Sequence, residues 1–185
     1  MSGLILPFKG KWPKIADDCF IAPTATIIGD VEIGPGSSIW FGTVLRGDYG
    51  AIRVGAKCSV QDNAVLHVYH TENSSHPTVL HDNVTVGHGA VIEGSEICER
   101  SLIGMNAVIL PLCKIGARSI VGAGSIVTGG QEFGEKSLIA GAPARFKREL
   151  PEEAAAGNDF STSEYARLAQ EYRAEMAALK AAKAG

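Results

Sequence analysis

A six-residue period in the aliphatic side chains restricts the fold of this sequence more than any other feature. Steps of six from Ile21 reach Ile27, Ile33, Ile39 and Leu45, and a second run follows at Val54, Val60 and Leu66. A third run extends from Val79 to Val127, with Thr85 as its one polar member. A helix repeats about every 3.6 residues and a strand about every 2, whereas hexapeptide repeats are typical of a β-helix.

Small residues complete the repeat, because glycine often follows the aliphatic residue and small side chains usually stand four positions after it. Glycine accounts for 22 of the 185 residues, well above the usual share of about 7%. Each hexapeptide supplies a strand and a corner, and three close a triangular coil of about eighteen residues. The repeat therefore predicts an all-β solenoid, a parallel β-helix.

The end of the chain has a different pattern. We expect one β-helix domain over residues 1–150, in which the repeat fades after Val127, and a linker and C-terminal helix that packs on it over residues 151–185. Ser161 and Glu164 have the spacing of a capping box, which predicts the start of the helix. An apolar stripe would face the β-helix, formed by Tyr165, Leu168, Tyr172, Met176 and Leu179. Tyr165 is also expected near a site.

Charge and cysteine content narrow the setting. The chain has 17 basic and 20 acidic residues, and no basic run that would follow a phosphate backbone, so we expect no nucleic-acid partner. Short apolar stretches and a start without a leader predict a soluble cytoplasmic protein with no membrane segment. Cys19, Cys58, Cys98 and Cys113 form no CxxC pair. Their spacing favours buried reduced thiols over disulfides or a zinc–cysteine site.

Two interruptions of the period, at residues 46–53 and 69–78, predict loops on one side of the solenoid, where functional residues gather. Four motifs lie in or near them: Arg46-Gly47-Asp48, Val60-Gln61-Asp62-Asn63-Ala64-Val65-Leu66-His67, Val84-Thr85-Val86-Gly87-His88-Gly89-Ala90 and Leu102-Ile103-Gly104-Met105-Asn106-Ala107. In this order they resemble the signatures of the γ-class carbonic anhydrase family of left-handed β-helix proteins, over about residues 8–150.

The resemblance implies reversible hydration of CO2 to bicarbonate by a metal-bound hydroxide at the interfaces of a homotrimer. It implies Zn²⁺ as the metal. Gln61 would orient the hydroxide through its amide. Arg46, Asp48 and Asp62 would form a salt-bridge set between subunits beside the metal.

The spacing of the candidate ligands supports a metal site independently. Position 93 follows His67 by 26 residues, which is one coil plus about the length of the second loop. The two side chains should therefore lie in neighbouring coils, about 4.8 Å apart at the backbone. His88 belongs to the face before the corner and would diverge from them within one chain. A threefold trimer would let His88 join the other two from a neighbouring chain.

Glu93 departs from the family pattern, which has a histidine at this position. Two histidines and a glutamate are a sound zinc set, and two histidines and a carboxylate also suit Fe²⁺. The carboxylate should make a bound water less acidic. Glu93 is therefore a ligand, an outer partner of the site, or a sign that the site has been lost.

Three functional hypotheses follow. The first is a γ-carbonic anhydrase-like enzyme, with His70, Glu72 or His76 of the second loop as proton carriers. The second is a hexapeptide-repeat acyltransferase using coenzyme A, against which the lack of a basic patch counts. The third is a catalytically silent trimeric scaffold or binding protein, which Glu93 favours. His81 is expected to be a surface residue without a partner.

Overall fold

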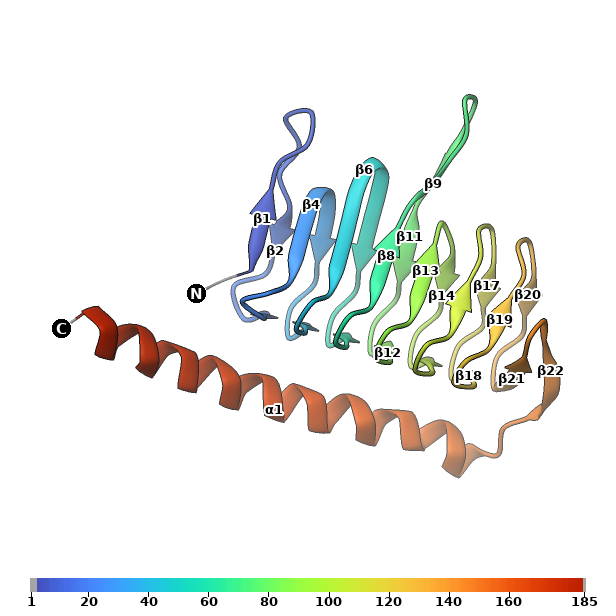
Figure 1. The fold of residues 1–185 in the computed structure, drawn as a ribbon. Helices are drawn as coiled ribbons and strands as arrows, with labels where there is room; N and C mark the ends of the chain where they lie inside the picture. The colour runs from blue at the N-terminus through green and yellow to red at the C-terminus, as the bar shows by residue number, and fades with distance from the viewer. Residues whose placement is uncertain (1–2, 185) are drawn as a thin grey trace.

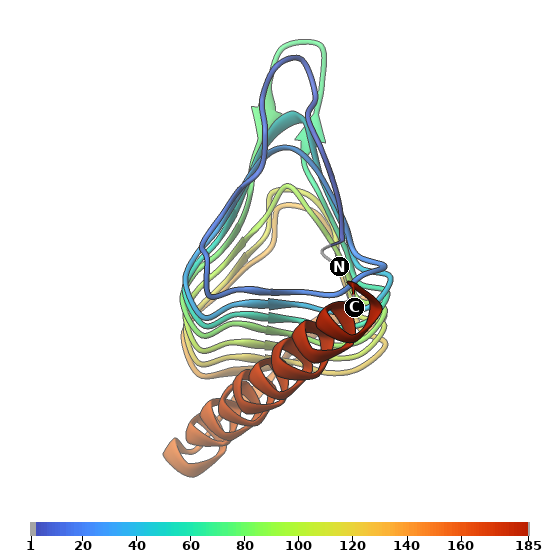
Figure 2. The same ribbon diagram turned by 90° about the vertical axis from the view of Figure 1, so that its left-hand side faces the viewer.

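The chain winds into a triangular solenoid, and a long helix lies across one of its three faces (Figures 1 and 2). The computed structural model describes residues 3–184, without the side chains of 155–162, 180, 183 and 184. Strands of successive coils pair in parallel, and the expected parallel β-helix followed by a C-terminal helix is confirmed.

Three flat faces make up the solenoid. Face A contains β1 (Leu4–Leu6), β8 (Val65–His67), β13 (Val91–Glu93), β16 (Val108–Ile109) and β19 (Ile126–Val127). Face B contains β2 (Lys14–Ile15), β11 (Thr78–Leu80), β14 (Glu96–Ile97), β17 (Lys114–Ile115) and β20 (Glu132–Phe133). Two long strands, β4 (Thr26–Ile33) and β6 (Val44–Val54), pass round the corner and belong to both faces.

Face C is the third sheet, and it supports the helix. Its strands are β3 (Phe20–Ile21), β5 (Ser38–Ile39), β7 (Ser59–Val60), β12 (Thr85–Val86), β15 (Leu102–Ile103), β18 (Ile120–Val121), β21 (Ser137–Gly141) and β22 (Ala144–Glu149). The last two strands pair antiparallel and close the end of the solenoid. This arrangement leaves the helix and the three faces as the surfaces on which a site can form.

The core consists of aliphatic side chains stacked in register. One inward stack runs through face A at Ile27, Leu45, Leu66, Ile92, Ile109 and Val127. All of these side chains are buried, as are their counterparts on faces B and C apart from Ile15, Ile21 and Phe133 in the terminal coils, which are half-buried. Each buried aliphatic contributes about 1.5–3 kcal/mol relative to an exposed one, so the repeat itself stabilises the fold.

The predicted third run is out of phase over its first half. Between the second interruption and Gly94 the inward residues are Leu80, Val86 and Ile92, not Val79, Thr85 and Val91. The phase returns because Ile97 follows Ile92 after five residues instead of six, across Gly94 with its φ of 49°. Thr85 breaks the aliphatic pattern because it does not occupy an inward position.

The repeat does not fade after Val127. Phe133 and Ile139 continue the six-residue step and pair with Ile115 and Val121 of the preceding coil. Ile139 is buried, so the repeat continues over faces B and C after Val127.

The two interruptions differ in structure. Residues 46–53 form no separate loop, because they lie within β6 as it rounds the corner between faces A and B. The second interruption contains a hairpin of β9 (Tyr69–His70) and β10 (Ser75–His76), which projects beyond the corner (Figure 1).

The helix α1 spans Glu152–Ala184 and begins directly after Pro151. The predicted linker and the start at Ser161 are therefore wrong, since Gly157 and Ser161 lie within the helix. The carboxylate of Glu152 forms ion pairs with the guanidinium of Arg118 at 3.1 Å and with Nζ of Lys136 at 2.6 Å. These contacts hold the first turn against the solenoid, and an acidic residue there also suits the helix dipole.

An aromatic cluster joins α1 to face C. Trp40 lies with its ring centroid 5.3 Å from that of Tyr165 and 5.6 Å from that of Tyr172. Ala169 of α1 is buried, whereas Leu179 is 59% exposed and does not belong to the contact stripe. Within residues 3–184, no helix has an apolar stretch long enough to cross a membrane.

Candidate metal centre

Four candidate site residues of faces A and C share one position in the coil, directly after the inward aliphatic residue: Arg46, Gln61, His67 and Glu93. We call the outward residues at this position column A and column C. Column A contains Ile28, Arg46, His67, Glu93 and Leu110. Column C contains Ala22, Trp40, Gln61, Gly87, Gly104 and Gly122. Parallel pairing sets neighbours in a column about 4.8 Å apart at the backbone, so their side chains interact.

His67 and Glu93 are direct neighbours in column A, in the register that their spacing predicts. His67 Nδ1 lies 3.8 Å from Glu93 Oε1, and the two side chains are 20% and 37% exposed. Two ligands of a tetrahedral ion with bonds of about 2.0–2.2 Å lie roughly 3.5 Å apart. This pair therefore fits a metal ion with little movement.

Asp48 holds the ring of His67. Its Oδ1 lies 3.0 Å from His67 Nε2, and it also accepts hydrogen bonds from Arg46 and from the backbone N–H of Tyr49. Partial burial works to raise the pKa of Asp48, but the hydrogen bonds from His67 and Arg46 outweigh it and lower that pKa. When Nε2 carries the proton, the lone pair of Nδ1 is left facing Glu93, as a ligand requires.

Thr78 supports the same pair from behind and was not recognised in the sequence. Its hydroxyl donates to the backbone carbonyl of His67 and accepts from the backbone N–H of Gly94 at 2.8 Å. A Cβ at Gly94 would lie 2.3 Å from Cβ of Tyr69, so only glycine fits there. Thr78 and Gly94 thereby fix the backbone on both sides of the candidate ligands.

His88 lies in the turn between β12 of face C and β13 of face A, away from column A. Its Nδ1 pairs with Asp62 Oδ2 at 2.8 Å, and its Nε2 lies 3.3 Å from the hydroxyl of Tyr165. Burial and then the charge of Asp62 raise the pKa of Tyr165. Among the described residues of one chain, the three predicted ligands His67, Glu93 and His88 are not brought together.

A groove runs between α1 and face C beside His88. Gln61, whose side chain is buried, stands at its end, and the next members of column C are glycines, which leave the space open. The groove has a volume of about 390 Å³. Its lining is mainly apolar and includes Gln61, His88, Leu102, Met105, Ile120 and Tyr165.

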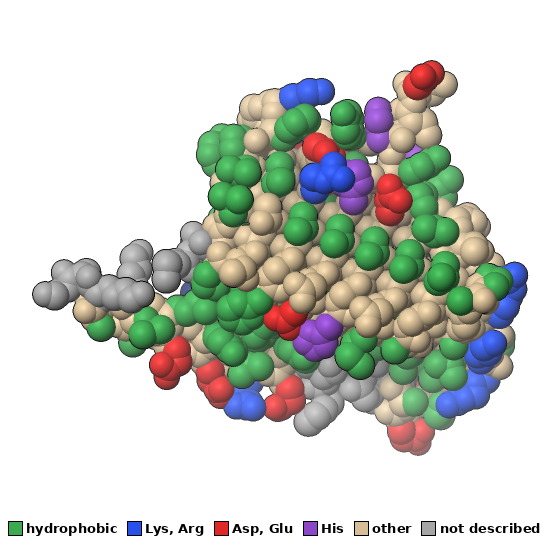
Figure 3. Space-filling view, viewed as in Figure 1, with side chains coloured by type: hydrophobic (Ala, Val, Ile, Leu, Met, Phe, Trp, Pro, Cys, Tyr) green, Lys and Arg blue, Asp and Glu red, His purple; other side chains and the backbone are tan. Residues whose placement is uncertain are grey.

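An outward row of aliphatic side chains crosses face A next to the candidate ligands. Its members are paired in register: Val44, Val65, Val91, Val108 and Ile126. Figure 3 shows this row as a band of hydrophobic side chains, with acidic, basic and histidine side chains gathered along its border. A flat, partly exposed apolar face of this kind is typical of an interface between subunits.

The candidate proton carriers lie on the hairpin of β9 and β10. His70 stacks on the ring of Tyr49 with 4.8 Å between centroids, and His76 stacks on Tyr69 at 5.9 Å. Glu72 is exposed in the turn. The hairpin therefore places His70 beside Tyr49, which directly follows Asp48 in the sequence.

The stacked coils, the inward aliphatic columns and the turns of the repeat define a hexapeptide-repeat protein. The family model described as bacterial transferase hexapeptide, six repeats, matches residues 13–47 and 94–129.

Individual relatives show which family of hexapeptide-repeat proteins the chain belongs to. It is 41% identical over 169 residues to "Gamma carbonic anhydrase 1, mitochondrial" of Arabidopsis thaliana, covering 90% of this chain and 62% of the plant protein. It is 39% identical over 171 residues to "Carbonic anhydrase" of Geobacillus kaustophilus, covering 92% of each. The chain belongs to the γ-carbonic anhydrase-like family of hexapeptide-repeat proteins.

A solved structure shows the same fold under another description. The crystal structure of a Bacillus cereus protein, described as an acetyltransferase, superposes with a TM-score of 0.89 at 38% identity. The match covers 94% of this chain and 99% of that one. The family is thus shared by proteins with different ascribed activities.

Proposed function

We propose that this protein catalyses the reversible hydration of CO2 to bicarbonate at metal sites between the subunits of a homotrimer. The observation that carries the proposal is the pairing of His67 with Glu93 on an apolar face, with His88 apart from them in the turn that leads from face C to face A. One chain thus offers two ligands at one place and the third at another. A second copy that covers face A completes the set.

The apolar surface of face A supports the proposed homotrimer. The apolar row on face A has no cover within the described part of the chain, and burying it against a neighbour would stabilise an oligomer by about 25 cal/mol per Å². His67, Glu93 and Arg46 border this row, so a neighbour packed on it would bring its own residues to the site. Cyclic symmetry makes three identical interfaces from one contact.

Bound Zn²⁺, or Fe²⁺ with the same ligands, would supply the Lewis acidity that yields a nucleophile from water at neutral pH. The residues of this chain do the rest. Asp48 fixes the orientation of His67, and Asp62 does the same for His88 through Nδ1, so that Nε2 of His88, which faces the hydroxyl of Tyr165 in one chain, would be the nitrogen that binds the ion. Glu93, being anionic, would weaken the positive field of a bound ion.

The substrate needs an apolar space with a few polar groups, and the groove beside His88 offers both. Leu102 and Met105 would exclude water around CO2, and the buried amide of Gln61 would orient the attacking oxygen. The released proton would leave by His70, Glu72 or His76 on the projecting hairpin. Arg46, beside Asp48, would hold the carboxylate in its charged form.

An acyltransferase using coenzyme A is the second candidate, because the Bacillus cereus structure is described as an acetyltransferase. The lining described for the groove contains no lysine or arginine to bind the phosphates of the cofactor. A silent trimeric scaffold is the third candidate, supported by Glu93.

The four free thiols fit a reducing compartment, and we propose that the protein is cytoplasmic.

The test is the transition-metal content of the protein purified without added metal, followed by CO2 hydration at neutral and alkaline pH. We expect one bound ion per chain at the interfaces and a hydration rate that His67→Ala abolishes. A protein with no transition metal, or a rate unaffected by His67→Ala, would contradict the enzymatic proposal. Acetyl-coenzyme A hydrolysis and transfer serve as the control activities.

Glu93→His tests the unusual ligand. Histidine at this position removes a negative charge from the ligand set and supplies a softer donor, so Zn²⁺ should bind more tightly and hydration at neutral pH should increase. Competition with a chelator measures the affinity. If neither quantity changes, Glu93 is not a ligand.

A further inference from the structure

Face B has a column of its own at the same position of the coil as columns A and C, and no residue of this column belongs to the proposed hydration site. We call column B the residues directly after the inward aliphatics of this face: Ala16, Gly34, Gly55, His81, Cys98, Gly116 and Gly134. Four coils have glycine here. Two successive coils instead carry His81 and Cys98, both of which are metal-ligand residue types.

Glycine is favoured in column B because a Cβ at several of its positions would clash with the backbone of the next coil. A Cβ at Gly34 would lie 2.7 Å from the carbonyl carbon of Gly55, and one at Gly116 would lie 2.4 Å from that of Gly134. Side chains are therefore restricted along the column, yet two stand side by side at its centre. The backbone N–H of His81 donates to the carbonyl of Ile97 at 2.9 Å, which fixes Cys98 as its direct neighbour in the next coil.

Glu96 completes a group of three. It points outward from β14, and its Oε1 lies 2.9 Å from His81 Nε2. The ligand atoms of His81, Glu96 and Cys98 all lie within 4.8 Å of one another. Two sequence-based expectations are thus wrong: His81 has a partner, and the thiol of Cys98 is only half-buried, unlike those of Cys19, Cys58 and Cys113.

We propose that His81, Glu96 and Cys98 form a second metal site, which takes a divalent transition ion of the Zn²⁺ type and leaves its fourth position open to solvent. An imidazole nitrogen, a thiolate sulfur and a carboxylate oxygen are the donors that Zn²⁺ combines in tetrahedral sites. Such donors lie roughly 3.3–3.8 Å apart. The contact of His81 with Glu96 has to open slightly and the thiol of Cys98 has to approach by about 1 Å, which rotation of side chains this exposed can provide.

Lys114 does not block the site. Its Nζ pairs with Glu96 Oε2 at 3.1 Å, whereas His81 faces Oε1. An ion that takes Oε1 displaces the hydrogen bond with His81 and leaves Lys114 to orient the carboxylate from the other side. Glu132 pairs in register with Lys114 and adds a compensating negative charge.

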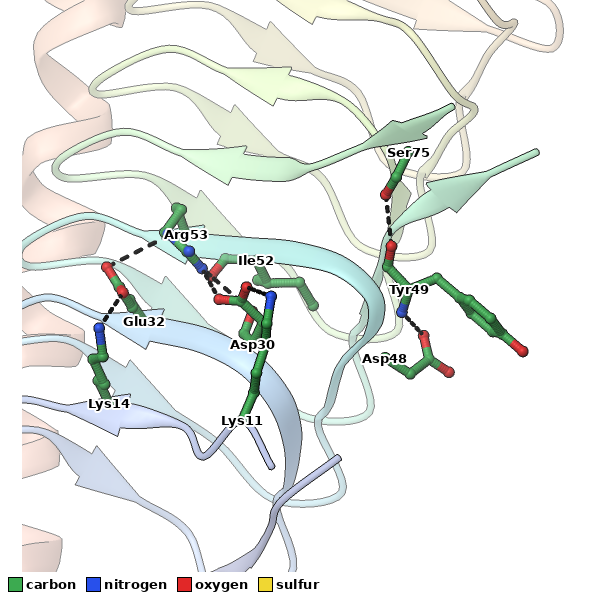
Figure 4. Close-up of polar contacts among 9 residues, drawn as sticks. All are labelled: Lys11, Lys14, Asp30, Glu32, Asp48, Tyr49, Ile52, Arg53 and Ser75. Carbon is green, nitrogen blue, oxygen red and sulfur yellow. Dashed lines mark hydrogen bonds and ion pairs between the residues drawn. The ribbon is translucent and has the colours of Figure 1, made fainter. Parts of the chain in front are cut away.

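Face B is suited to remain in contact with solvent. Its outward row is charged at every coil except at Val79. Arg53 pairs with Glu32 of this row at 3.5 Å and with Asp30 at 2.8 Å, and Lys14 pairs with Glu32 at 3.0 Å (Figure 4). This contrasts with the aliphatic row of face A. A groove of about 550 Å³ beside these residues reaches His81, so an ion can approach the site from solvent.

Co²⁺ added to the metal-free full-length protein tests the proposal, because a thiolate bound to Co²⁺ gives a near-ultraviolet charge-transfer band that imidazole and carboxylate ligands do not. The wild type should develop this band, and Cys98→Ser should lose it. Cys113→Ser is the matched control, since Cys113 is buried and serine fills equivalent positions in other coils. His67→Ala should retain the band, which separates this site from the proposed hydration site.

A second variant covers the case in which Cys98→Ser fails to fold. His81→Ala leaves the thiol in place, and it should weaken Co²⁺ binding at this site at least tenfold while the far-ultraviolet circular dichroism is unchanged. The proposal is overturned if the wild type shows no band, if Cys98→Ser keeps it, or if His67→Ala or Cys113→Ser removes it.

Discussion

Replacing Gly116 by alanine should destabilise the solenoid through one close contact. The added Cβ would lie 2.4 Å from the carbonyl carbon of Gly134, 2.5 Å from its oxygen and 2.6 Å from the nitrogen of Glu135. These are backbone atoms of the next coil, and an ordinary contact needs at least 3.4 Å. The two coils must therefore separate by about 1 Å at a corner where their strands are hydrogen-bonded.

The magnitude follows from two opposing effects. Overpacking of this kind costs about 1–3 kcal/mol. Loss of chain entropy in the unfolded state returns about 0.4–1 kcal/mol when glycine becomes alanine. The net of the two effects is a loss of up to about 2.5 kcal/mol in the free energy of unfolding, and we expect Gly116→Ala in the upper half of that range because the Cβ meets backbone atoms.

Gly134→Ala is the matched control, because it lies in the same column one coil later and its Cβ would meet nothing within 4 Å. Its stability should be equal to or slightly above that of the wild type. Urea unfolding at a single protein concentration measures both variants, since the stability of an oligomer depends on concentration. Equal losses in the two variants would refute the account of the corner column.

Two further predictions concern charge and thiols. The hydrogen bond from Lys11, with help from Arg53, lowers the pKa of Asp30, so its contribution to stability is present above about pH 4 and is lost as the pH falls. Asp30→Asn should cost under about 1 kcal/mol at pH 7 and nothing near pH 2, as thermal unfolding across that range would show; a constant difference contradicts this. Cys98 should react first with a thiol reagent and be protected by Zn²⁺, whereas burial raises the pKa of Cys58 to about 12 and should keep it unreactive; mass spectrometry of labelled peptides decides.

Much of the fold could be read from the six-residue period because each inward residue must be aliphatic. The phase error over Val79, Thr85 and Val91 arose because the true inward residues, one position later, are aliphatic too. Only the five-residue step across Gly94 distinguishes the two phases, and it depends on how the corner packs against Tyr69.

The first residue of α1 could not be predicted from the neighbouring sequence. Ser161 and Gly157 are ordinary signals for a helix start and a linker. The helix begins nine residues before Ser161, at Glu152, which forms ion pairs with Arg118 and Lys136. These partners lie far away in the sequence, so no local pattern contains them.

The candidate site was predictable where it depends on counting residues between coils. The spacing of His67 and Glu93 gave their register because both lie in one column. The contact of His81 with Glu96 joins two different positions of neighbouring coils, and the segment in which the phase is shifted separates the two residues in the sequence. That group therefore became visible only in three dimensions.

Complementation between two inactive variants tests most directly the claim that each site is shared by two chains. In His67→Ala and His88→Ala homotrimers every site lacks a ligand, and both should be free of interface metal and inactive. When equal amounts are unfolded together and refolded, each mixed trimer regains one complete site, so metal content and CO2 hydration should recover to about a quarter of wild type. If mixing restores nothing while trimers form, or if either variant keeps its metal unmixed, the shared-site account is contradicted.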